Sequence, residues 1–229
     1  MRKIIILIIT VSFSFNCIAQ GVIPKEIRNI GDQVDLDRMQ AADGSRYINV
    51  KGAPYLTDFF VPATIYPDDD LFFVKYNAVD DEIEVKLSAT KTIILDNSFK
   101  KYTIVFKESK ETFVTLNEEG KNNPSYFIEV NKTDNVSLYK RKTKNFIQAT
   151  KATDNYSKDK PARFSELEEV FYIQLTPDGP VKEVSKKKKT FLKMFQNNQN
   201  DVKNFIGKNK IKLNKEEDLV KLISFISTL

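Results

Sequence analysis

Short segments in which apolar and polar residues alternate recur through the middle of the chain, and this alternation limits the folds open to it. In residues 82–87, Ile83, Val85 and Leu87 fall on one side of an extended chain and charged residues fall on the other. Successive side chains of a strand point to opposite faces, so the pattern predicts a strand with one buried face. The same period of two recurs in residues 102–106, 114–116, 126–130, 136–138 and 171–175.

Two further segments, residues 71–76 and 92–95, are more continuously apolar. Such runs are typical of strands covered on both faces, so we expect both segments near the centre of a sheet. Turn-forming residues separate the segments, and from Phe59 onward strands follow at intervals of about 8 to 12 residues, as in antiparallel sandwiches and barrels. The expected class is mainly β, an antiparallel sandwich or open barrel over residues 49–184.

After residue 184 the apolar period changes to that of a helix. Two short helices are predicted around Phe191 and Phe195 and around residues 202–206, with Gly207 as a C-terminal cap. A third is predicted over residues 214–229, with Asn214 as its N-cap. The expected architecture is α+β overall, with a C-terminal helical subdomain of about three short helices over residues 185–229.

Residues 1–19 have the pattern of a cleavable signal peptide. Arg2 and Lys3 precede an uncharged apolar stretch, and small residues end it at Ala19, which predicts cleavage before Gln20. The stretch is shorter than the roughly 20 apolar residues that span a bilayer, so a retained anchor is the weaker alternative. A lipoprotein acylated at Cys17 is another, but Asn16 precedes that cysteine where processing favours a small residue. We expect an exported protein that is periplasmic, outer-membrane-associated or extracellular, with no transmembrane segment after cleavage.

The exported chain would contain no cysteine and no disulfide, because Cys17 lies in the leader. Residues 20–48 are polar and lack periodicity, so they are predicted to form an extended N-terminal arm. Histidine is absent from the whole chain, which excludes a Ser-His-Asp triad and a histidine-ligated zinc or haem site. Glycine-rich phosphate-binding motifs are also absent. The sequence therefore predicts no catalytic residue, no metal and no cofactor.

Acidic residues gather at two predicted turns. Asp80, Asp81, Glu82 and Glu84 could supply the two carboxylates of a glycosidase, but a solvated turn followed by the outward face of a strand explains them better. Residues 68–70 are three aspartates that could ligate calcium, but their spacing matches no EF-hand loop, so a surface turn is preferred.

Lysines are concentrated near the C-terminus. Residues 182–215 contain 11 lysines against only two acidic residues, Glu183 and Asp201, which gives a local net charge of +9. Such a patch attracts anionic surfaces, but it lacks the arginines that specific phosphate or nucleic-acid recognition usually employs. The alternative is that these lysines only form a soluble, solvent-exposed face of the helices and bind nothing. The centre of the patch is formed by Lys186, Lys187, Lys188, Lys189 and Lys193.

Three segments, taken in order, carry a resemblance. Residues 52–56 read Gly-Ala-Pro-Tyr-Leu, residues 76–85 begin Tyr-Asn and end Asp-Glu-Ile-Glu-Val, and residues 208–229 are lysine-rich with a Glu-Glu-Asp-Leu helix start. The chain resembles a group of uncharacterised secreted proteins of Gram-negative bacteria with GSPYL-like and RYNxxxDEIEV-like segments. Here Ala53 replaces the usual serine and Lys75 the usual arginine. The resemblance implies an envelope or extracellular location and brings no known activity.

The main functional hypothesis is a noncatalytic exported module that binds an envelope component or a partner protein. The alternatives are a carboxylate-dependent hydrolase acting on envelope polysaccharide and association with an anionic surface through the basic helices. In the resembling segments, Tyr55 and Leu56 are expected to pack against the sheet, with a strand-turn-strand unit following. The alternative is a ligand groove formed by Tyr55, Tyr76, Asn77, Asp80, Asp81 and Glu82.

Overall fold

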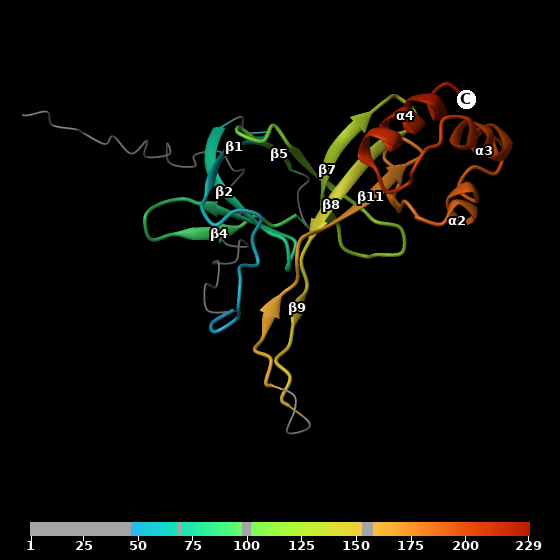
Figure 1. Cartoon of the computed structure of the whole chain (residues 1–229). Helices are drawn as coiled ribbons and strands as arrows, with labels where there is room; N and C mark the ends of the chain where they lie inside the picture. The colour runs from blue at the N-terminus through green and yellow to red at the C-terminus, as the bar shows by residue number, and fades with distance from the viewer. Residues whose placement is uncertain (1–46, 68–69, 98–101, 153–157) are drawn as a thin grey trace, which may run out of the picture.

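The computed structural model describes residues 47–67, 70–97, 102–152 and 158–229 (Figure 1). The predicted leader, nearly all of the expected arm, and Asp68 and Asp69 of the aspartate turn lie outside these residues. Among the residues described, no helix has the length and apolar character needed to cross a bilayer.

One antiparallel sheet of ten strands dominates the structure. Its strands are β1 (Val61–Tyr66), β2 (Asp70–Asn77), β3 (Glu82–Lys86), β4 (Thr92–Ile94), β5 (Thr103–Phe106), β6 (Thr112–Leu116), β7 (Ser125–Lys132), β8 (Ser137–Thr143), β11 (Glu168–Gln174) and β12 (Lys182–Glu183). Their order is β12-β11-β8-β7-β6-β5-β1-β2-β3-β4, so the order has two ends and the sheet is not closed on itself. The predicted mainly β class is confirmed.

The sheet curls strongly around its main core. The rings of Tyr76 on β2 and Phe113 on β6 lie 5.1 Å apart, although β1 and β5 separate these strands in the sheet. The Tyr126 hydroxyl on β7 also donates a hydrogen bond to the carbonyl of Leu95, just after β4, at 3.3 Å. A flat sheet would hold these strands far apart. The curled face therefore encloses its own side chains, in an arrangement closer to the expected open barrel than to two stacked sheets.

The expected central position of residues 92–95 is wrong. Strand β4 is the last strand of the order and pairs only with β3 among the described strands. Residues 71–76 form most of β2, where Leu71 is 47% exposed and Phe73 36% exposed. A short apolar run does not reveal how many neighbours a strand has, because an edge strand of a curled sheet also packs against the core.

Three short helices lie near the C-terminus, as predicted, and they cover the other end of the same sheet face. They are α2 (Lys188–Leu192), α3 (Gln199–Lys208) and α4 (Glu216–Ile226), and α4 lies on β7 and β8. On β7, Ile128 belongs to the main core and Val130 packs in the helical core. The helical core combines residues of the sheet and of the helices, including Leu138, Ile173, Phe191, Val202, Leu219 and Leu222.

Both predicted helix caps are wrong. Gly207 lies inside α3, whose C-cap is Asn209, and the later residue Lys210 takes the positive φ of 52°. The N-cap of α4 is Lys215, with no side-chain capping bond, so Asn214 stands one position too early. Acidic residues in the first turn of α4 still favour its positive end.

A two-stranded ribbon extends the β8–β11 pair away from the sheet (Figure 1). It consists of β9 (Phe146–Ile147) and β10 (Arg163–Phe164). Tyr47 packs edge-on against Phe164 with ring centroids 5.0 Å apart. Strands of two residues carry no readable alternation, so the sequence pattern missed this ribbon.

Candidate functional site

The turn between β2 and β3 is held by side chains that the sequence marked as ligand-binding. Asn77 Oδ1 accepts hydrogen bonds from the backbone N–H groups of Val79 and Asp80 at 3.0 and 3.1 Å. Asn77 Nδ2 donates to Asp80 Oδ2 at 2.7 Å. The Tyr47 hydroxyl lies 2.7 and 2.8 Å from the two carboxylate oxygens of Asp80. These bonds make Asn77 and Asp80 parts of a tight turn.

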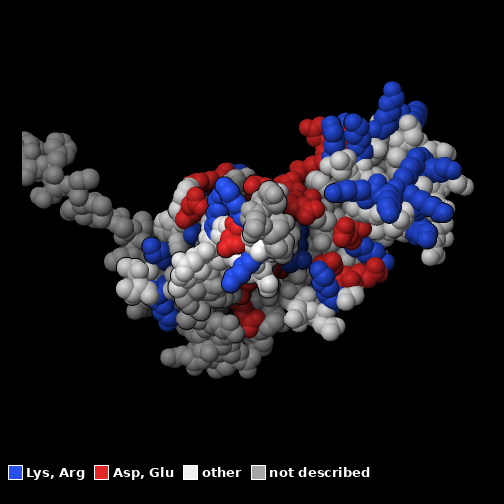
Figure 2. Space-filling model, turned by 60° about the horizontal axis from the view of Figure 1, so that its bottom comes forward, with Lys and Arg blue, Asp and Glu red and all other residues white. Residues whose placement is uncertain are grey.

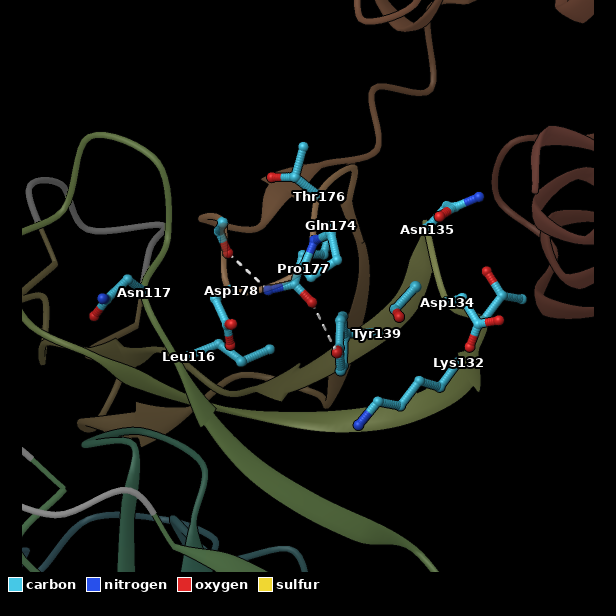
Figure 3. Close-up of a pocket in the computed structure, with 13 residues that line it drawn as sticks. Leu116, Asn117, Lys132, Asp134, Asn135, Tyr139, Gln174, Thr176, Pro177 and Asp178 are labelled. Carbon is cyan, nitrogen blue, oxygen red and sulfur yellow. Dashed lines mark hydrogen bonds between the residues drawn. The ribbon is translucent and has the colours of Figure 1, made fainter. Parts of the chain in front are cut away.

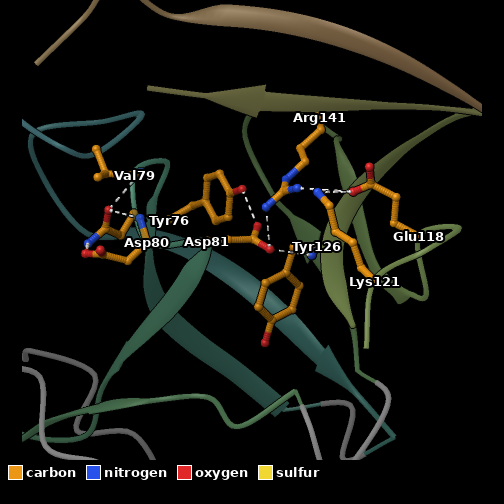
Figure 4. A network of polar contacts seen from close by, with 9 residues as sticks. Tyr76, Val79, Asp80, Asp81, Glu118, Lys121, Tyr126 and Arg141 are labelled. Atoms are coloured by element: carbon orange, nitrogen blue, oxygen red, sulfur yellow. Dashed lines mark hydrogen bonds and ion pairs between the residues drawn. The ribbon is translucent and has the colours of Figure 1, made fainter. Parts of the chain in front are cut away.

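Asp81, the last residue of this turn, is the centre of a buried polar network (Figure 4). Its Oδ1 accepts a hydrogen bond from the Tyr76 hydroxyl at 2.6 Å. Its Oδ2 accepts one from the Tyr126 backbone N–H at 3.2 Å and lies 3.0 Å from Arg141 Nη2. Asp81 also takes a φ of 59°, which is uncommon for a residue with a side chain. Aspartate tolerates this conformation better than most residues, so it suits both the turn and the network.

Burial sets the electrostatics of this network. It raises the pKa of the Asp81 carboxyl above the ordinary 3.8, while Arg141 and the hydrogen-bond donors oppose the shift. Burial also raises the pKa of the Tyr76 hydroxyl well above 10.0, and the Asp81 charge adds to that effect. For Arg141, burial alone would lower the pKa, but Asp81 raises it above the ordinary value. Arg141 therefore stays charged and Tyr76 stays a hydrogen-bond donor at neutral pH.

Arg141 continues the network to a second carboxylate. Its Nη1 lies 3.6 Å from Glu118 Oε2, which also pairs with Lys121 at 2.6 Å. The guanidinium stands 5.9 Å from the centre of the Phe127 ring. Arg141 thereby connects strand β8 to the β2–β3 turn and to the loop after β6. The sequence analysis did not single out Arg141, because one arginine within a strand has no local signature.

Tyr55 and Glu84 form a separate contact on the outer face of β3. The Tyr55 hydroxyl donates to Glu84 Oε1 at 2.8 Å, and Lys75 Nζ lies 3.7 Å above the Tyr55 ring. Leu56 packs against the main core, and its N–H donates to the Tyr76 carbonyl. Glu84 is buried, at 7% exposure, so the expected outward, solvated face of β3 is wrong at this position. The physical reason is that residues 54–56 cover it.

Apart from Tyr55, which contacts Glu84, the predicted ligand-binding set separates into two groups. Tyr76 and Asn77 are buried, at 1% and 2% exposure, and they support the fold rather than line a cavity. Asp80, Asp81 and Glu82 line a pocket of about 580 Å³, which we call the acidic pocket. Its other lining residues come from the end of β4 and the segment after it, from the start of β7 and the segment before it, and from Arg141. Asp80 and Asp81 accept the bonds described above.

A second cavity, of about 490 Å³, lies where three turns meet (Figure 3). We call it the turn groove. It is bounded by the end of β6, the β7–β8 turn and the loop after β11, and its floor is formed by side chains of β8 and β11. Its lining residues are Leu116, Asn117, Lys132, Thr133, Asp134, Asn135, Ser137, Tyr139, Gln174, Thr176, Pro177, Asp178 and Gly179.

Gln174 holds the floor of the turn groove in place. Its Oε1 accepts a hydrogen bond from the Tyr139 hydroxyl at 3.1 Å, and its Nε2 donates to the Gly179 carbonyl at 2.7 Å (Figure 3). Thr133 closes the β7–β8 turn through a hydroxyl bond to the Val136 carbonyl at 2.6 Å. By contrast, the side chains of Asn117, Asn135 and Asp178 are exposed and form no hydrogen bond within the described part of the chain.

The sequence analysis treated turn-forming residues only as separators between strands. Residues 132–135 and 176–180 have the composition that reverses a chain, and such residues are read as connections. Which turns gather at one end of a sheet depends on strand order, because β6, β7, β8 and β11 must be neighbours first. The turn groove was therefore missed, although its polar residues were visible.

The predicted basic patch lies on the helical subdomain. Lys186, Lys187, Lys188, Lys189 and Lys193 are all exposed, as are Lys203, Lys208, Lys210, Lys212 and Lys215. Figure 2 shows lysines and arginines gathered over one end of the molecule, with acidic side chains prominent elsewhere on the same view. The apolar sides of these helices are buried in the helical core, which leaves their lysines outward.

Two further searches, for a metal site and for similar proteins, give no function. In the described ranges, no cluster of three or more carboxylate or cysteine side chains is placed to hold a metal ion. Comparisons of the chain with protein-family models, with curated proteins and with solved structures find no match.

Proposed function

We propose that this chain is an exported, noncatalytic binding module of the bacterial cell envelope, which takes a polar ligand in the turn groove. The observation that carries the proposal is a cavity of about 490 Å³ whose rim presents Asn117, Asn135 and Asp178, none of which has a side-chain hydrogen-bond partner among the residues that the structure describes. Small-molecule sites commonly occupy about 300 to 1,000 Å³. The leader pattern and the resemblance to secreted proteins support export to the envelope.

The chemistry of the lining favours a glycan as the ligand. Amide side chains both donate and accept hydrogen bonds, and hydroxyl groups do the same. The turn groove presents the exposed amides of Asn117 and Asn135 and the exposed hydroxyl of Thr176. These groups match the hydroxyl and N-acetyl groups of an envelope sugar. The Tyr139 ring is buried, at 3% exposure, so recognition rests on hydrogen bonds rather than on ring stacking.

The contacts of the acidic turn favour binding over hydrolysis. A glycosidase needs one carboxyl to donate a proton and another to act as base or nucleophile. Asp81 instead lies in an ion pair with Arg141, Asp80 accepts bonds from Asn77 and Tyr47, and Glu84 accepts one from Tyr55. These three carboxylates hold the turn and its neighbouring segment together.

Isothermal titration of the purified protein with N-acetylglucosamine oligomers and with soluble peptidoglycan fragments tests the proposal. Saturable binding that weakens about tenfold, or roughly 1.4 kcal/mol, in Asn135→Ala and in Asp178→Asn supports it. Asp178 takes a φ of 59°, and asparagine tolerates that conformation, so the variant removes charge without backbone strain. Asn145→Ala, on the exposed ribbon, is the matched control.

Two outcomes would reject the proposal. The first is that none of these glycans binds saturably, or that the control weakens binding as much as the groove variants do. The second is that new reducing ends accumulate while the glycan is incubated with the protein, and that Asp80→Asn or Glu82→Gln stops their formation. That second result would establish the hydrolase alternative.

A further inference from the structure

The charge of the exported chain is divided between its helical subdomain and the rest. The leader holds two of the 36 basic residues, and the helical subdomain, residues 185–229, holds 11 lysines and four of the 31 acidic residues. The remainder from Gln20 onward therefore has 23 basic and 27 acidic residues, a net charge of about −4 beside +7 for the subdomain. A division of this kind orients a protein in an electric field. Beside an anionic surface, such a division would turn the helical subdomain toward that surface.

The lysines of the helical subdomain are available for an external partner. In the sheet, Lys140 and Lys142 pair with Glu111 and Lys182 pairs with Glu119. No lysine from Lys186 to Lys215 has an ion pair in the described part of the chain, and all of them are exposed. Lys188 Nζ donates one long hydrogen bond to the Lys203 carbonyl, at 3.4 Å. The helices are held together mainly by the buried apolar faces of α2, α3 and α4.

The shape of this surface suits an extended partner rather than a small anion. Neither the turn groove nor the acidic pocket is lined by any residue between Lys186 and Lys215. The charges project outward from the helices, as Figure 2 shows. The segment contains no arginine, whose planar fork recognises single phosphates in fixed geometry. Flexible lysines instead respond to the summed charge of many headgroups.

From these observations we infer that the helical subdomain docks on an anionic lipid bilayer through its exposed lysines. Export would place this surface beside membranes and away from cytoplasmic nucleic acid. The attraction is electrostatic and acts over about one Debye length, roughly 10 Å at 0.1 M salt and 3 Å at 1 M. Binding is therefore reversible and salt-sensitive.

Cosedimentation with vesicles tests this docking, using protein purified from cells that express the full chain. The vesicles are phosphatidylcholine alone, or phosphatidylcholine with about one third phosphatidylglycerol. The test variant changes Lys186, Lys187, Lys188 and Lys189 to glutamine. A second variant does the same at Lys203, Lys208, Lys210 and Lys212. The control variant makes four matched changes at exposed lysines of the body, Lys91, Lys107, Lys151 and Lys158.

We expect the protein to bind the anionic vesicles at low salt, to leave them at about 1 M salt, and to ignore neutral vesicles. Both helical variants should bind at least about tenfold more weakly, and the control variant should bind like the original protein. Far-ultraviolet circular dichroism confirms that each variant is folded. Equal losses in the control and helical variants would overturn the inference, as would binding to neutral vesicles. The inference would also fail if duplex DNA, at equal phosphate concentration, displaced the protein from the vesicles, because the lysines would then prefer nucleic acid to lipid.

Discussion

Arg141 Nη2 lies 3.0 Å from Asp81 Oδ2, although 60 positions of sequence separate the two residues. In the sheet, β8 and the β2–β3 turn are likewise far apart in strand order. The pair therefore joins the two regions that the curl of the sheet brings together. The hydrogen bond from the Tyr126 hydroxyl to the Leu95 carbonyl likewise joins β7 to the segment after β4.

Replacing Arg141 with methionine is expected to destabilise the fold by about 3 kcal/mol at neutral pH, because it leaves the Asp81 charge buried without its partner. Both side chains of the pair are only 14% exposed, so solvent screens the loss little. The loss should shrink at acid pH, where Asp81 takes up a proton. Urea unfolding at both pH values measures it.

Lys132→Met is the matched control for that change. Lys132 lies 3.8 Å from Glu129 and its side chain is 67% exposed, so removing its charge should change stability by less than about 1 kcal/mol. Equal effects of the two substitutions would mean that Arg141 contributes no more than a surface cation. A loss for Arg141→Met that does not depend on pH would also contradict the role given to Asp81.

The raised pKa of Asp81 predicts the direction of a pH effect. Since its folded-state pKa lies above the unfolded value near 3.8, the folded protein binds this proton more tightly. The contribution of Asp81 to stability is therefore complete below the unfolded pKa and is lost as the pH rises through the folded pKa. The test compares the original protein with Asp81→Asn. As the pH rises from the unfolded to the folded pKa of Asp81, the unfolding free energy of the original protein minus that of the variant should fall. Denaturation of both proteins across acid pH measures it, and a rising difference would mean that the pKa is lowered.

The fold class could be predicted because it depends on local patterns. Alternation in residues 82–87 marked β3, and the change to a helical period after residue 184 marked the three helices. The strand β1, by contrast, was not singled out, since its central residues Ala63, Thr64 and Ile65 are all buried and show no alternation. Strand order and curl depend on contacts between distant segments, and a single sequence does not display those contacts.

The candidate sites were harder to predict for the same reason. Tyr76 and Asn77 stood out as polar residues near a turn, yet their polar groups bond to Asp81 and Asp80 inside the fold. Asn117, Asn135 and Asp178 belong to three separate turns and come together only through the pairing of β6, β7, β8 and β11. The lysine patch was visible in the sequence because its residues are neighbours along the chain.

The helical core predicts that sheet and helices unfold together. Leu219 on α4 is fully buried among residues of β8, β11 and the other helices, so Leu219→Ala should cost about 3 kcal/mol. Tyrosine fluorescence and circular dichroism should report one shared transition. Lys221→Ala, on the exposed side of the same helix, should change stability by less than about 0.5 kcal/mol. Separate transitions for helices and sheet would show that the helical segment folds independently.

Gln174 is expected to determine the shape of the turn groove, because it bonds both to the Tyr139 hydroxyl and to the Gly179 carbonyl. Gln174→Met fills similar space but removes both bonds, which should cost about 2 kcal/mol. Tyr139→Phe removes only the first bond and should cost about 1 kcal/mol. The Gly179 N–H, which bonds to the Thr176 carbonyl, should exchange with solvent faster in Gln174→Met alone. If its exchange is equally fast in both variants, Gln174 does not hold the loop after β11.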